Sequence, residues 1–264
     1  ASDIIKSDIL SQRRSRVDKF LKYPGEHIDD LLCKDLKIIQ HPNSYRFAID
    51  TVLLANFVKA GRKDRVIDLG TGSGVIALLI SAKTDAKEII GIEIVNEAFD
   101  RAVRSVNMNK LQDRVKIVHG NIKEVVNVFG MGSFSVVVTN PPYMTLNEGK
   151  ISPNPNLAIA RHEVAASLQD VVKAAWELLT SGGRFYMVYR AVRVADAIYE
   201  LKARGLEPKI LRFIHPSAEN SPNLFLVMAK KGAGPGVKIL PPLVVYNSDG
   251  SYTDEIKEIY FGKQ

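Results

Sequence analysis

The residues best suited to chemistry are Asn140, Pro141, Pro142 and Tyr143, which follow the apolar run 134–138. This run has the composition of a strand buried on both faces. The prolines end the strand because neither can donate a ladder hydrogen bond. The Asn140 amide oxygen and the Pro141 carbonyl can accept both hydrogens of a planar NH2 group, and the Tyr143 ring can stack on its face. Alone, the motif fits a proline-rich turn equally well.

A glycine loop upstream favours the functional interpretation. Residues 65–69 predict a short strand and residues 75–81 an apolar helix, with a glycine loop between them. This arrangement is the nucleotide-binding unit of a doubly wound fold, because glycines allow close approach and the helix start offers free N–H groups. Val75 replaces the third glycine of the dinucleotide fingerprint, and the lysine of an ATP-binding P-loop is missing. The loop and the acid before it supply five candidate cofactor-binding residues: Asp68, Gly70, Thr71, Gly72 and Gly74.

The next two predicted strands add polar groups at the same edge of the sheet. Glu93 ends the strand 88–93, where an acid can accept both hydroxyls of a ribose, and Ile94 can pack on an adenine ring. A third strand over 115–119 leads into Asn121. His119 has no partner at metal-ligand spacing, so we predict no metal site.

The run 68–74, Asp-Leu-Gly-Thr-Gly-Ser-Gly, resembles motif I of the class I S-adenosylmethionine-dependent methyltransferases. The resemblance implies S-adenosylmethionine as cofactor, with its methionine end wrapped by the loop and Asp68 beside it. This family commonly has an aspartate where Asn121 stands, contacting the adenine amine, and the asparagine oxygen can accept the same bond. Ile122 and Asn140 complete the expected cofactor-binding set. Together with Asn-Pro-Pro-Tyr, the resemblance implies methylation of a nitrogen in a planar group, with Asn140, Pro141 and Tyr143 catalytic.

Three further stretches are similar to one branch of that family, the bacterial tRNA(Val) adenine-N6 methyltransferases. They are 45–47 with Asp50, 160–163 and 182–185, and the resemblance extends from about residue 36 to 232. It implies a tRNA substrate methylated at N6 of an adenine beside the anticodon. Pro142, Tyr143, Arg161 and His162 are the expected substrate-binding residues.

These motifs require a Rossmann-like α/β fold of the class I methyltransferase type. We expect a seven-stranded doubly wound sheet, mostly parallel, with an antiparallel last strand formed by a hairpin of 209–214 and 224–230. Helices are predicted over 51–58, with Asp50 as N-cap, and from 161 to 179, followed by a turn at 181–183. The expected division is a basic N-terminal arm (1–35), the catalytic domain (36–232) and a C-terminal extension (233–264) with a short helix near Asp254.

Composition sets the broader expectations. The net charge of +7 and the pI of about 9.3 favour an anionic partner such as RNA. Cys33 is the only cysteine, and no apolar run is long enough to span a bilayer, which together predict a cytoplasmic protein without membrane association. No pattern indicates the oligomeric state.

Several alternatives stay open at this point. A protein glutamine-N5 methyltransferase acting on a release factor would need the same motif, because a carboxamide is also planar and carries NH2. A ribosomal RNA base methyltransferase is a third possibility. A non-catalytic RNA-binding protein is disfavoured by the complete loop and acceptor motif, and a dehydrogenase by Val75.

Overall fold

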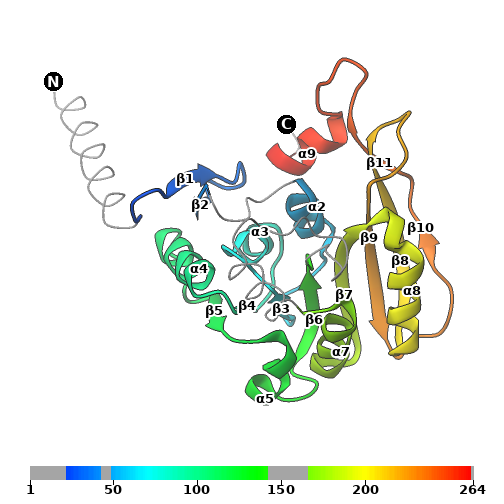
Figure 1. Cartoon of the computed structure of the whole chain (residues 1–264), viewed down its shortest axis with the longest axis horizontal. Coiled ribbons are helices and arrows are strands. Elements are labelled where there is room, and N and C mark those ends of the chain that lie inside the picture. Colours follow the sequence, from blue (N-terminus) through cyan, green and yellow to red (C-terminus); the bar gives the residue numbers. More distant parts are fainter. Residues whose placement is uncertain (1–21, 43–48, 142–165, 263–264) are drawn as a thin grey trace, which may run out of the picture.

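A nine-stranded mixed sheet runs through the described part of the protein, with helices on both faces (Figure 1). The computed structural model describes residues 22–42, 49–141 and 166–262. Five parallel strands lie in the order β5-β4-β3-β6-β7. Their bounds are β3 (Arg65–Leu69), β4 (Glu88–Glu93), β5 (Val115–His119), β6 (Phe134–Thr139) and β7 (Leu179–Arg190). The winding reverses between β3 and β6, so the doubly wound prediction is confirmed.

The hairpin predicted at the far side of the sheet is present. β9 (Leu224–Lys231) lies between β7 and β8 (Leu206–Ser217) and is antiparallel to both. The expected strand number was too low, because β10 (Lys238–Ile239) and β11 (Leu243–Tyr246) of the C-terminal tail pair with β8 in parallel. Both strands cover an edge of β8 that would otherwise present unpaired backbone groups.

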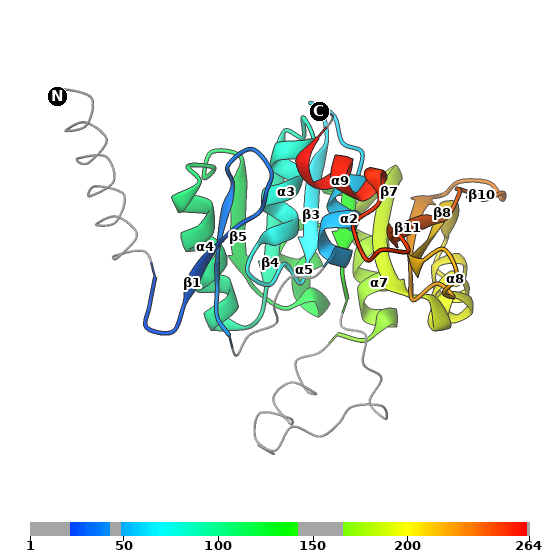
Figure 2. The ribbon, with the colours of Figure 1, turned by 90° about the horizontal axis from the view of Figure 1, so that it is seen from above.

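The helices divide between the two faces of the sheet (Figure 2). One face carries α2 (Ile49–Phe57), α3 (Val75–Lys83), α4 (Asn96–Met108) and α9 (Asp254–Phe261). The other carries α5 (Val125–Phe129), α7 (Leu168–Leu178) and α8 (Val194–Ala203), with short 3-10 turns η1 (Ile122–Glu124) and η2 (Ala191–Arg193). On β6, Val136 and Val138 enter the first core and Val137 the second. This alternation explains why the three consecutive residues 136–138 are all apolar.

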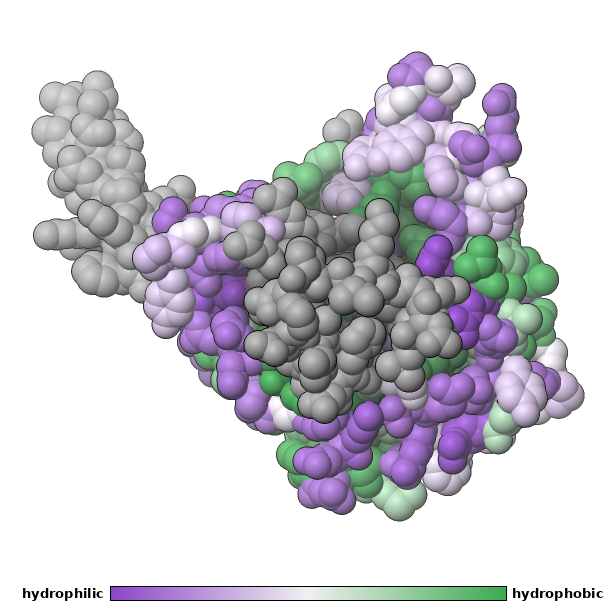
Figure 3. All heavy atoms as spheres, in the orientation of Figure 1, coloured by the Kyte–Doolittle hydropathy of each residue, from purple (hydrophilic) through white to green (hydrophobic). Residues whose placement is uncertain are grey.

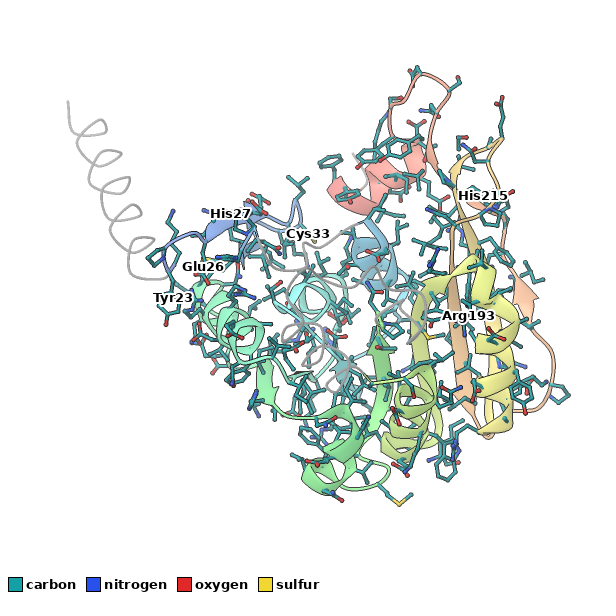
Figure 4. The ribbon with its side chains drawn as sticks, viewed as in Figure 1. Tyr23, Glu26, His27, Cys33, Arg193 and His215 are labelled. Carbon is teal, nitrogen blue, oxygen red and sulfur yellow. The ribbon has the colours of Figure 1, made fainter. Side chains whose placement is uncertain are left out.

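The N-terminal segment lies over α4 as a hairpin of β1 (His27–Asp30) and β2 (Lys37–Gln40). Arg104 of α4 forms two hydrogen bonds of 2.7 and 2.8 Å to the Glu26 carboxylate and stacks over the Tyr23 ring. Figure 4 shows Tyr23 and Glu26 beside α4. Ser105 accepts a 3.0 Å hydrogen bond from the Ile39 N–H. These contacts fix the hairpin beside the first helical layer.

Two local predictions in the later half need correction. The helix expected from residue 161 begins at Leu168 within the described residues, because Ser167 and Asp170 form a reciprocal capping box. The turn expected at 181–183 is part of β7, where the pairing with β6 shifts between Phe134 and Val136. Gly182 has a φ of 71°, so the glycines accommodate a bulge rather than a chain reversal.

The C-terminal tail shares a hydrophobic core with the helices that precede it in the chain. Leu243, Val245, Ile256 and Ile259 belong to the same buried cluster as α2 and α3. The expected helix near Asp254 is present as α9. The division at residues 35 and 232 stays a prediction. Within the described ranges, every helix is too short or too polar to cross a bilayer.

Candidate active site

The ends of β3 and β6 bring the two main motifs together. Leu69 and Thr139 are paired neighbours, and the Thr139 hydroxyl donates a 2.9 Å hydrogen bond to the Leu69 carbonyl. The next residue on one strand is Gly70 and on the other Asn140. Because ligands of doubly wound sheets bind where the winding reverses at the strand carboxyl ends, this position is the expected binding crevice.

The glycine loop adopts a conformation that depends on its glycines. Gly70, Gly72 and Gly74 have φ values of 76°, 59° and 92°. The N–H groups of Gly70 and Thr71 both donate to the Ile92 carbonyl at 3.0 Å, which fixes the loop to the end of β4. A Cβ on Gly72 would meet nothing within 4 Å, so this backbone is open to a ligand. On Gly74 it would lie 3.3 Å from the Ala102 Cβ, where α3 packs on α4.

Asp68 is fully buried beneath this loop. Neither carboxylate oxygen has a hydrogen-bond partner among the described residues, and the same is true of the nearby Thr71 hydroxyl oxygen. Loss of water around the carboxylate raises the pKa of Asp68 to about 7. The nearby Thr71 hydroxyl opposes this rise although its geometry makes no hydrogen bond, and the negative charge of Glu93 adds to it. A buried acid without a partner is costly, so it marks a place where a cationic or hydrogen-bonding ligand would lower the free energy.

Glu93 also holds the loop. Its Oε2 accepts from the Gly72 N–H at 2.8 Å, and its Oε1 accepts from the N–H groups of Ile94 and Val95, both at 2.9 Å. A carboxylate has about four acceptor positions, so three are occupied by backbone. A grip on both hydroxyls of a ribose would require one of these bonds to open.

A shallow pocket continues from Glu93 along the sheet edge. Its walls combine apolar side chains with glycines and the polar residues Glu93 and Asn121. Asn121 caps η1, with its Oδ1 accepting from the Lys123 N–H at 2.9 Å. The pocket brings together Gly70, Ile92, Glu93, Ile94, Gly120, Asn121, Ile122 and Ala166. Five residues assigned to the cofactor from the sequence are therefore neighbours in space.

Asn140 directly follows β6, and its side chain contacts the start of helix α2. The Nδ2 atom donates to Asp50 Oδ2 at 3.1 Å and to Thr51 Oγ1 at 3.3 Å. The interpretation of Asp50 as an N-cap was wrong, since Asp50 lies inside α2 and is 3% exposed. Pro141 follows Asn140 and is buried. The remaining expected residues, Pro142, Tyr143, Arg161 and His162, lie outside the described residues.

Sequence reasoning missed two features of the site. It gave no role to the contact of Asp50 and Thr51 with Asn140, which joins segments 90 and 89 residues apart. It also passed over Gly91 in β4, where a Cβ would lie 2.8 Å from the Thr71 side chain. A glycine inside a buried strand is itself a signal for close approach of another group.

The crevice has the groups that S-adenosylmethionine would need. Its cationic end would find the unpartnered Asp68, the open Gly72 backbone leaves room for a ligand, and the pocket at Ile94 and Ile122 suits a flat ring. No cluster that could hold a metal ion is found within residues 22–42, 49–141 and 166–262.

Comparisons with known proteins point in the same direction. The family model "Methyltransferase small domain" matches residues 40–203. A protein of Dyadobacter fermentans is 23% identical over 82% of this chain and 89% of its own length. One of Pedobacter heparinus is 26% identical over 85% and 93%. Both relatives are named tRNA1(Val) (adenine(37)-N6)-methyltransferase.

Solved structures share the fold. A predicted O-methyltransferase from Agrobacterium tumefaciens superimposes with a TM-score of 0.65 at 24% identity, covering 81% of this chain and 96% of that one. Geranyl diphosphate C-methyltransferase from Streptomyces coelicolor, in complex with S-adenosyl-L-homocysteine, gives a TM-score of 0.51 at 13% identity, covering 80% and 94%.

Proposed function

Because the chain belongs to the methyltransferase small domain family, we propose that it transfers a methyl group from S-adenosylmethionine to the N6 amine of an adenine in tRNA. The observation that carries this proposal is the pairing of β3 with β6. Because the two strand ends are neighbours, the glycine loop and the buried Asp68 follow one strand and Asn140 follows the next, which supports a shared site. The chain can thus hold a cationic donor next to a planar acceptor.

The donor side is proposed to bind the cofactor through several groups of this chain. When bound, S-adenosylmethionine supplies an electrophilic methyl group on a positively charged sulfur. Asp68 balances positive charge at the methionine end, and the backbone at Gly72 lies against it. Glu93 accepts a ribose hydroxyl at its remaining acceptor position. Ile94, Asn121 and Ile122 hold the adenine ring.

The acceptor side is proposed to activate a weak nucleophile by position alone. The N6 lone pair is delocalised into the adenine ring. When Asn140 Oδ1 and the Pro141 carbonyl accept its two hydrogens, the nitrogen becomes more tetrahedral and its lone pair turns towards the methyl carbon. A bound S-adenosylmethionine would supply the methyl group and would retain the C–S electron pair, so Asn140 and Pro141 need only hold the amine in line with it. The methylated amine then loses a proton to solvent, so no strong base is required.

A tRNA substrate is supported by the names of the relatives and by the charge of +7. Hydrophilic residues cover much of the described face drawn in Figure 3, which suits contact with RNA. The target base must leave its stack to enter the site. For bases in RNA loops, which are already partly unstacked, the free energy of unstacking is small. A cytoplasmic location follows from this substrate.

Parallel labelling identifies the acceptor. The protein is incubated with methyl-labelled S-adenosylmethionine and, separately, with total tRNA, unmodified ribosomal RNA or a release factor. Label in tRNA, recovered as N6-methyladenosine after digestion, is the expected result. Label found only in the release factor would instead identify a glutamine methyltransferase, and label only in ribosomal RNA would move the substrate to the ribosome.

Substitution of Asn140 separates catalysis from cofactor binding. Asn140→Ala removes an acceptor that acts on the reacting amine, so we expect methyl transfer to fall by roughly 100- to 1,000-fold. Affinity for S-adenosylmethionine, measured by calorimetry, should fall far less than transfer does, because Asn140 is only one member of the expected cofactor-binding set. Asn109→Ala is the matched control. Asn109 directly follows α4, and its amide forms hydrogen bonds only with the backbone of Lys37 and Ser105. Weak cofactor binding with intact transfer in Asn140→Ala would contradict the assignment.

A further inference from the structure

The Asn140 side chain can assist transfer in only one of its two orientations. The amide is planar, and a half-turn about its last bond exchanges oxygen and NH2 at little intrinsic cost. With Oδ1 towards the incoming amine, it accepts a hydrogen. With Nδ2 there, two NH2 groups would face each other. Some part of the protein must therefore specify the orientation.

Two residues in the first turn of α2 face the amide. Asp50 Oδ2 is 3.1 Å and Thr51 Oγ1 is 3.3 Å from Asn140 Nδ2. Asp50 is 3% exposed and Thr51 6%. Asp50 Oδ1 also accepts from the Thr51 N–H at 2.7 Å and from the Thr51 hydroxyl at 3.3 Å. The hydroxyl proton is thereby used, which leaves the Thr51 oxygen as an acceptor for Asn140.

The hydrogen-bonding chemistry of these groups then favours one orientation of the Asn140 amide. An ionised carboxylate only accepts hydrogen bonds. If the amide were reversed, Asn140 Oδ1 would face two oxygen acceptors at about hydrogen-bond distance with little water to separate them, which is strongly unfavourable. The NH2 group therefore points to α2. Among the described residues nothing donates to Asn140 Oδ1.

We propose that Asp50 is a positioning residue, which holds the Asn140 amide so that Oδ1 meets the amine to be methylated. This role rests on the proposed function, since it concerns the same reaction. A hydrogen bond from the amide to a carboxylate also polarises the amide and makes Oδ1 a stronger acceptor. Helix α2 thus contributes to transfer without touching the substrate, and Thr51 reinforces the contact.

The test uses Asp50→Asn, which keeps the shape but replaces an obligate acceptor with an amide that can also donate. Protein labelled with 15N on asparagine gives side-chain NH2 signals, and the Asn140 pair is assigned by its loss in Asn140→Ala. In Asp50→Asn we expect hydrogen exchange of this pair to accelerate at least about tenfold. Single-turnover transfer to tRNA should fall roughly 100-fold, with dissociation constants for cofactor and tRNA within about threefold.

A matched control and a second variant show whether the effect of Asp50→Asn is specific or reflects a general disturbance of the fold. Asp64→Asn also neutralises a partly buried carboxylate, but Asp64 lies before β3 and bonds Gly61, Ser135 and Arg184. It should change neither the exchange of the Asn140 pair nor the transfer rate. If Asp50→Asn does not fold, Thr51→Val removes one acceptor and should raise the exchange rate and lower the transfer rate in the same direction, to a smaller extent.

The outcomes separate the two proposals. Wild-type protein that methylates no tRNA overturns the proposed function, while the exchange data still decide the positioning role. Normal exchange of the Asn140 pair in a folded Asp50→Asn protein overturns the positioning role, and so does a transfer rate within threefold of wild type. Equal losses of transfer in Asp50→Asn and Asp64→Asn would likewise overturn it, since the effect would then reflect general loss of carboxylate charge.

Discussion

At the scale of single residues, the site depends on buried polar groups that differ in how many hydrogen-bond partners they have. Glu93 has three backbone donors, and Asn140 is held by Asp50 and Thr51. Asp68 has no hydrogen-bond partner among the described residues. Such a group lowers stability in the free protein. Its presence is explained if a ligand supplies the missing partner.

The pKa of Asp68, raised to about 7 by burial, predicts a pH-dependent stability of the free protein. An unfolded aspartate ionises near pH 4. Between about pH 4 and 7 the folded protein binds the extra proton, so this contribution to stability is complete at low pH and is lost as the pH rises through 7. Asp68→Asn should remove that loss and raise the free energy of unfolding at pH 8 by roughly 2 to 4 kcal/mol. Denaturant unfolding of the wild-type protein and of Asp68→Asn at pH 5 and pH 8 measures this difference in the free energy of unfolding.

The same substitution should weaken cofactor binding. The affinity of the wild-type protein for S-adenosylmethionine should increase from pH 6 to pH 8 as Asp68 ionises. In Asp68→Asn this affinity should change less with pH. A variant that binds S-adenosylmethionine as tightly as wild type at pH 8 would show that Asp68 is not part of the cofactor site.

At the scale of elements, the strand ends and the helix starts decide the geometry. β3 leads into the loop, β4 fixes it through the Ile92 carbonyl, and β6 presents Asn140 opposite. α2 approaches from a distant part of the sequence to orient that amide. Close packing between these elements is therefore part of the site, and Gly91 is the tightest place.

Gly91→Ala should disturb the loop through β4. The added Cβ would lie 2.8 Å from both Thr71 Cγ2 and Thr71 Oγ1 and 2.9 Å from Thr71 Cβ, so the loop must shift. We expect a loss of about 1 to 3 kcal/mol in the free energy of unfolding, with weaker cofactor binding. Gly61→Ala is the control, because the nearest atom to its Cβ is 3.9 Å away. Unchanged thermal unfolding and cofactor affinity in Gly91→Ala would mean that the loop adapts without cost.

At the scale of the whole molecule, the C-terminal tail belongs to the folded body. β10 and β11 extend the sheet beside β8, and α9 lies near α2 (Figure 1). Lys83 at the end of α3 donates a 2.6 Å hydrogen bond to the Ile259 carbonyl. The tail thus supports α2 and α3, the two helices next to the crevice.

Truncating a tail side chain should therefore destabilise the protein as a core substitution does. Ile256 is fully buried in the cluster shared with α2 and α3, and Ile256→Ala should cost about 2 to 5 kcal/mol. Phe261→Ala, on the same helix with 56% of the residue exposed, should cost much less. Chemical denaturation gives both values, and similar small losses would indicate a tail that is only loosely attached.

The sequence by itself determined the fold class and the approximate positions of the glycine loop and of Asn140. These follow from local signals, because apolar runs, glycines and prolines restrict the backbone within a few residues. Tertiary structure decided the start of α7, the two extra strands beside β8, the β1 strand and the role of Gly91. It also decided that Asp50 faces Asn140 instead of capping its own helix. Such contacts join residues far apart in the chain, and a capping residue and a buried partner have the same local appearance, so only packing distinguishes them.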